Sequence, residues 1–200
     1  MSVDGFNYVN ILMRALNRIG DVMILSIVFV VSCLPIFTIG ASITALYYAT
    51  MKSLKIEDGY VFKFFIKSFK DNFKQSTIIW LISFAVLSVL GIDVWFWHNQ
   101  WKANDSDMLQ AMLIVSIIML SVAIMVVMYV FPLQAKFDNK TKVQFRNAFL
   151  LSIKYFPTTI LLAAIMAIVV WMFYYQFVLA VIGFVLFGFG LMGYIYVSLC

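Results

Sequence analysis

The chain has 200 residues, of which 64% are hydrophobic and 12% charged, and its formal net charge is +5. Soluble domains carry about 25% charged residues, so this composition excludes an ordinary water-soluble protein. The basic residues lie in short segments between apolar blocks. Membrane orientation and anionic lipid head groups explain them there without nucleic acid binding.

Four blocks contain no charged residue: 22–51, 75–92, 108–135 and 155–200. A bilayer core about 30 Å thick needs roughly 20 apolar residues for one helical crossing. We therefore expect an all-α, polytopic transmembrane helical bundle that forms a single membrane domain over residues 1–200. The first and last blocks are long enough for two crossings each, which gives six expected spans: 16–34, 39–54, 76–95, 108–131, 158–175 and 177–199.

Block 22–51 is the ambiguous one, because a helix of that length would measure about 45 Å. Pro35 would break or kink it, and Thr38 or Ser42 is suited to cap a new helix. Gly40 would permit close packing. Two interpretations of the break from Pro35 to Ser42 are open: a tight hairpin packed on small residues, or a broken helix whose freed polar groups line a cavity. We expect two short crossings here, with a single crossing or a re-entrant hairpin as alternatives.

The basic residues favour six crossings with both termini in the cytoplasm. In that topology Lys102 is the one basic residue outside and the other thirteen are inside, as the positive-inside rule requires. A single crossing by block 22–51 would move Arg14 and Arg18 outside and reduce the ratio to 11 against 3. A hairpin that never reaches the outer surface gives the same ratio as two crossings.

Segment 60–75 predicts a separate cytoplasmic amphipathic helix. Its apolar side chains share one helical face: Phe62, Phe65, Ile66, Phe69 and Phe73. A lysine follows four of these positions by one residue and flanks the face: Lys63, Lys67, Lys70 and Lys74. The rings are suited to the acyl boundary and the lysines to lipid phosphates, which favours an interfacial helix that sets depth in the bilayer. The alternative is a docking helix for a cytoplasmic partner such as a transport ATPase subunit.

Asp93 is the only acidic residue well inside an apolar stretch, and an intramembrane carboxylate is a functional candidate by default. Its place near the outer end of a helix favours a solvated or locally paired carboxylate. A proton-handling pair with His98 is the alternative, although a spacing of five residues suits one helical face poorly. One histidine and two isolated cysteines give no metal or nucleophile–base pattern. We therefore expect no enzyme activity, no cofactor and no metal site.

Several segments resemble the YesL family, an uncharacterised group of bacterial membrane proteins found mainly in Gram-positive species. They are Leu34–Tyr48 (LPIFTIGASITALYY), Phe64-Phe65, Ser68–Lys70, Asn72–Gln75 and Phe145–Phe149 with Pro157. The resemblance covers most of the chain and implies no catalytic residue. It implies an accessory role beside carbohydrate uptake or polysaccharide breakdown.

We therefore expect a non-enzymatic protein of the bacterial plasma membrane that binds a carbohydrate transporter permease or ATPase subunit. Helix 60–75 and the connection 136–156 would supply the contacts. The main alternative is a self-contained small transporter or channel that uses the Pro35–Ser42 break and Asp93.

Overall fold

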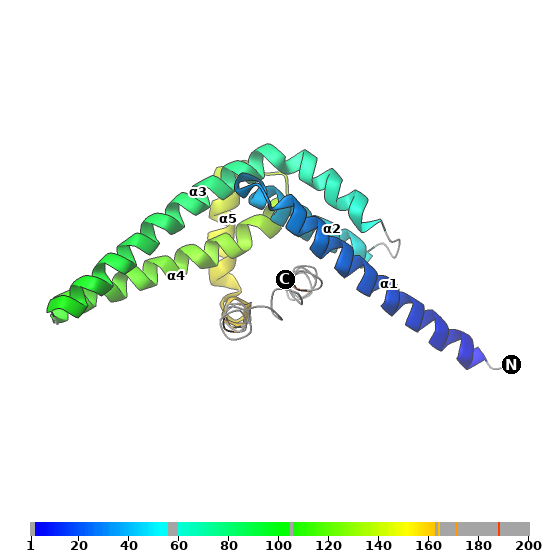
Figure 1. Ribbon diagram of the computed structural model, residues 1–200, viewed down its shortest axis with the longest axis horizontal. Coiled ribbons are helices and arrows are strands. Elements are labelled where there is room, and N and C mark those ends of the chain that lie inside the picture. The colour runs from blue at the N-terminus through cyan, green and yellow to red at the C-terminus, as the bar shows by residue number, and fades with distance from the viewer. Residues whose placement is uncertain are drawn as a thin grey trace.

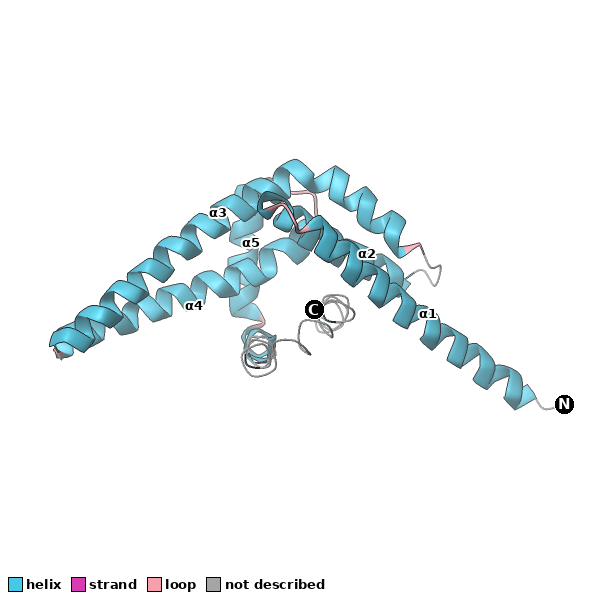
Figure 2. Cartoon of the chain, in the orientation of Figure 1, coloured by secondary structure: helices cyan, strands magenta, loops and turns pink. Residues whose placement is uncertain are grey.

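The computed structural model describes residues 3–55, 60–104 and 106–162, with residues 164, 171 and 188 in isolation. Within these ranges every regular element is helical (Figure 2). The elements are α1 (Val3–Ser32), the 3₁₀ helix η1 (Ile36–Thr38), α2 (Ile39–Lys55), α3 (Val61–Asn104), α4 (Asp107–Lys136) and α5 (Thr141–Lys154). The expected all-α class is therefore confirmed for the described residues. The expected spans 158–175 and 177–199 lie mostly outside the described residues.

The predicted break after α1 is present, because α1 ends at Ser32 and α2 begins at Ile39. Pro35 has an extended backbone, with ψ at 123°, and precedes the short η1. The Thr38 hydroxyl lies 2.6 Å from the carbonyl oxygens of Ser32 and Pro35, to which it donates. The bond to Ser32 satisfies a carbonyl group that the end of α1 leaves free.

The prediction that Thr38 or Ser42 caps α2 through an accepting side-chain oxygen was wrong. The Thr38 hydroxyl donates backwards to carbonyls, as described above. Ser42 lies inside α2, and its hydroxyl donates to the carbonyl oxygen of Thr38 at 3.0 Å. The turn is therefore closed by the Thr38 hydroxyl together with the backbone bond from the N–H of Thr38 to the carbonyl oxygen of Pro35, at 3.0 Å.

Helix α3 is one continuous element of 44 residues, about 66 Å of helix. The expectation of an amphipathic helix 60–75 separate from a span 76–95 was wrong. Residues 61–90 contain neither Pro nor Gly, so nothing in the backbone stops the helix where its side chains change from amphipathic to apolar. Figure 1 shows α3 changing direction along its length, with its first part beside α1 and α2 and its later part beside α4.

Two clusters of buried side chains hold the helices together. The first joins α1, α2 and the start of α3: Leu25, Phe29, Ala45, Leu46, Ala49, Val61 and Phe65. The second joins the middle of α3 to α4, α5 and the segment that follows: Ile79, Tyr129, Val130, Phe131, Ala148 and Leu162. We call α1, η1, α2 and residues 61–75 the hairpin unit. We call residues 76–104 of α3 and 107–128 of α4 the arm, which points away from the hairpin unit in Figure 1.

The arm is apolar on its outer surface. Its large exposed side chains include Leu81, Phe84, Val89, Ile92, Met108, Val115, Ile118 and Met119. Only 11% of the most apolar stretch of either helix is buried, whereas a core helix of a soluble protein is mostly buried. By length and composition, α3 and α4 are the two helices in the described part of the chain that can cross a membrane. This exposed apolar surface suggests association with a membrane.

Candidate functional site

The first part of α3 exposes its lysines and covers much of its aromatic face. Lys63, Lys67, Lys70 and Lys74 are all exposed to solvent. We call these four residues the lysine face. Segment 61–75, all of it described, contains one acidic side chain, that of Asp71. The lysine face is therefore a net positive surface available for binding.

The aromatic residues of the same segment turn towards α1 and α2. Phe65 is fully buried in the first cluster, so its ring is not free to contact lipid or a partner. Phe69 is half-buried, and its ring centroid lies 6.2 Å from that of Phe65 and 5.5 Å from that of Phe73. Phe62 is exposed. The amphipathic pattern distinguished the lysine-bearing face from the aromatic face correctly. Most of the aromatic face is covered by other parts of the protein.

Of the Pro35–Ser42 break, the part at Gly40 is closely packed, where the start of α2 contacts α3. A methyl group added at Gly40 would press on the carbonyl oxygen of Ser76 and lie 2.5 Å from Cβ of Trp80. Beside it, the Thr44 hydroxyl donates to the carbonyl oxygen of Gly40 and accepts from the Ser76 hydroxyl, both at 3.0 Å. Ala41 and Ala45, in the same part of α2, are fully buried. Small residues of α2 therefore pack closely on α3, and the hydroxyls of Thr44 and Ser76 are bonded to protein atoms.

Asp93 joins the two helices of the arm. Its Oδ1 accepts a hydrogen bond from Nε1 of Trp97 at 3.0 Å, and its Oδ2 accepts one from the Ser116 hydroxyl at 2.5 Å. The carboxylate is half-buried. The ring of His98 lies beside Trp101, with 6.4 Å between centroids. Asp93 is therefore held by local donors, as the favoured interpretation of the sequence expected.

Sequence reasoning missed a chain of side-chain amides at the junction of α3, α4 and α5. Oδ1 of Asn72 accepts from Nε2 of Gln134 at 3.2 Å, and Oε1 of Gln134 accepts from Nε2 of Gln144 at 3.0 Å. Gln144 also donates to the carbonyl oxygen of Phe137 at 2.7 Å. Both glutamines are buried. Gln134 was the residue from which the sequence could have indicated this chain of amides. An amide inside an uncharged block needs a hydrogen-bond partner when it is buried.

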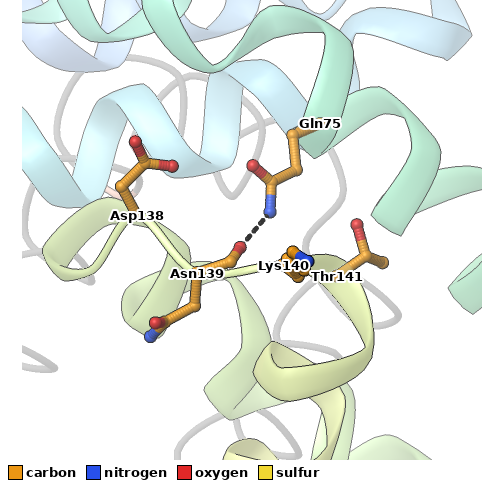
Figure 3. A pocket seen from close by; sticks show the side chains of 5 residues that line it. All are labelled: Gln75, Asp138, Asn139, Lys140 and Thr141. Carbon is orange, nitrogen blue, oxygen red and sulfur yellow. Dashed lines mark hydrogen bonds between the residues drawn. The ribbon is translucent and has the colours of Figure 1, made fainter.

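A shallow polar hollow of about 390 Å³ lies beside this junction (Figure 3). Gln75 and the connection Asp138–Thr141 line it. Figure 3 shows the Gln75 amide pointing to the carbonyl oxygen of Asn139, to which it donates at 2.5 Å. No group of three or more potential metal ligands occurs among the described residues. The arrangement is suited to polar or charged contacts at a surface.

Residues 21–94 match the model of a protein family described as a protein of unknown function, DUF624. The match agrees with the resemblance to the uncharacterised YesL family. The DUF624 segment runs from the later part of α1 through α2 and along α3 as far as Asp93 and Val94. No curated protein and no solved structure matches the chain.

Proposed function

We propose that the chain is an integral protein of the bacterial plasma membrane that serves a transport system as a non-enzymatic accessory. In this proposal the arm crosses the bilayer, both termini are cytoplasmic, and the lysine face binds an acidic surface of a permease or ATPase subunit. The link to carbohydrate uptake rests on the YesL resemblance.

The continuity of α3 is the observation that carries this proposal. One helix bears the exposed lysine face at its start and the exposed apolar surface of the arm further on. A partner that binds the lysine face is therefore coupled through one continuous helix to the part that is suited to lipid. The apolar surface supports insertion, and the lysine face supports recognition of an acidic surface.

The distribution of basic residues supports the orientation. Gln75 of α3 contacts the connection between α4 and α5, so the lysines around that connection lie at the same end of the arm as Lys74. They are Lys136, Lys140 and Lys142. Lys102 lies in the last turn of α3, at the opposite end. The positive-inside rule assigns the lysine-rich end to the cytoplasm.

Affinity capture from native membranes tests the proposed function. The tagged chain should co-purify with a permease or ATPase subunit, and a variant with all four residues of the lysine face changed to glutamate should lose that protein. The matched control changes the same four residues to arginine, which keeps the charge and should retain capture. Unchanged capture by the glutamate variant, at equal membrane yield, would exclude the lysine face as the docking surface.

Asp93 supports the alternative of a self-contained transporter, because it is a half-buried carboxylate between two apolar helices. A transporter would move substrate alone after reconstitution in liposomes and would lose that activity with Asp93→Asn. An accessory protein would show no such flux, and Asp93→Asn would leave partner capture unchanged.

A further inference from the structure

We infer that the α1–α2 hairpin is a re-entrant element of the cytoplasmic leaflet, with its turn inserted among lipid acyl chains. The hairpin then does not cross the bilayer, and the six predicted crossings become four. This inference rests on the proposed membrane location of the arm. Lipid then covers the exposed apolar surface of the turn.

The contacts of Gly40 and Thr44 fix the level of the turn. Both residues pack against Ser76 of α3. Ser76 lies two residues after Lys74, where the uncharged block 75–92 begins. In the proposed orientation this point is the cytoplasmic boundary of the bilayer core.

The turn cannot reach the outer surface from that level. Leu34 precedes Gly40 by six residues, and six residues span at most about 21 Å even when fully extended. The hydrocarbon core is about 30 Å thick. The two-crossing interpretation needs the turn at the outer surface, so it is incompatible with the contact between α2 and Ser76.

The remainder of the hairpin lies beside the lysine-bearing part of α3. In the first cluster, Leu25 and Ala45 pack with Phe65. Near the open end of the hairpin, the Ser53 hydroxyl donates a hydrogen bond to Oδ2 of Asp21 at 3.3 Å. The exposed lysine face on the same unit disfavours a position deep in hydrocarbon. The hairpin unit therefore lies at the cytoplasmic interface.

The turn and the outer face of α1 are apolar and uncovered in the part of the chain that the structure describes. Leu34 is 77% exposed, Ile36 70% and Phe37 53%. Ile24, Ile27 and Val31 are also exposed, and their spacing of three and four residues places them on one face of α1. Acyl chains suit this apolar surface, and anionic head groups suit the lysine face of the same unit.

Thiol labelling tests the topology. In a chain with Cys33→Ala and Cys200→Ala, single cysteines are placed by Phe37→Cys, Lys74→Cys and Ala103→Cys. A further variant carries a cysteine in a flexible Gly/Ser insertion after Phe37, which a crossing hairpin would present outside. In intact cells an impermeant maleimide should label Ala103→Cys only. Labelling of Phe37→Cys or the insertion at the same rate would overturn the inference.

A second measurement identifies what covers the turn. An environment-sensitive fluorophore on Phe37→Cys in liposomes should be quenched strongly by brominated lipid, and one on Lys74→Cys should be quenched less. An unquenched fluorophore at position 37 would mean that protein, such as a second copy, covers the turn and would contradict the lipid assignment. Failure of Ala103→Cys to label from outside would instead contradict the orientation of the arm, and with it the proposed function.

Discussion

The hydroxyl of Ser76 donates a hydrogen bond to the hydroxyl of Thr44, 3.0 Å away, across the contact between α2 and α3. Both side chains are fully buried. The bond lies where α3 passes from its lysine-bearing part to its apolar part. It therefore links the hairpin unit to the arm.

Replacing Gly40 with alanine should destabilise the protein. The new methyl group meets a backbone carbonyl oxygen at Ser76 and Cβ of Trp80, neither of which is the mobile end of a side chain. Overpacking of this kind costs about 1–3 kcal/mol. Thermal unfolding in detergent measures the effect as a lower melting temperature.

Gly20→Ala and Gly91→Ala are matched controls for that experiment. Both glycines lie inside helices, and a Cβ at either position meets nothing within 4 Å. Each should be neutral or stabilising by about 0.5–1 kcal/mol, because alanine loses less conformational entropy in a helix. Equal destabilisation at all three positions would contradict the close crossing at Gly40.

Removing the Ser76 hydroxyl should have a smaller effect. In Ser76→Ala the Thr44 hydroxyl still donates to the carbonyl oxygen of Gly40, so no buried donor is left unpaired. We expect a loss of about 0.5–1.5 kcal/mol in the free energy of unfolding. A double-mutant cycle with Thr44→Val should show coupling between the two positions, and strict additivity would exclude a direct bond.

Replacing Gln144 with leucine should weaken the junction of α3, α4 and α5. The change leaves Oε1 of Gln134 without its donor, whereas the carbonyl oxygen of Phe137 still accepts from the backbone N–H of Asn139 at 3.2 Å. Buried acceptors left unpaired cost about 1–3 kcal/mol. Chemical denaturation should show this loss, whereas Gln110→Leu at an exposed position of α4 should shift stability by less than about 0.5 kcal/mol.

The double variant Gln134→Leu/Gln144→Leu tests whether the two amides act as one unit. Its loss of stability should be smaller than the sum of the two single losses, because Gln134→Leu removes the acceptor that Gln144→Leu leaves unpaired. A loss equal to the sum would show that the amides contribute independently.

Asp93→Ala should loosen the end of the arm. The carboxylate accepts from both Trp97 and Ser116, and its loss leaves two donors without that acceptor. Limited proteolysis in detergent should cut the connection near residues 104–106 faster than in the unmodified chain. Ser116→Ala, which removes one of the two bonds, should give a smaller acceleration. An unchanged cleavage rate in both variants would exclude a structural role for Asp93.

The sequence predicted the helical class and the break at Pro35, because periodicity and Pro35 act locally. It missed the continuity of α3, since a change in side-chain polarity does not by itself end a helix. It also missed that α1 and α2 cover Phe65, because an aromatic face suits lipid and protein equally well. The amide chain depends on Asn72 and Gln134, which are 62 residues apart, and no local pattern predicts such a pairing.

Two thiols on α3 provide the most direct measurement of the proposed arrangement. Lys67→Cys and Lys102→Cys are placed separately in a chain that lacks Cys33 and Cys200. An impermeant maleimide should label position 102 in intact cells and position 67 only after the membrane is opened. Labelling of both positions from the same side would contradict a crossing by α3 between the lysine face and Lys102.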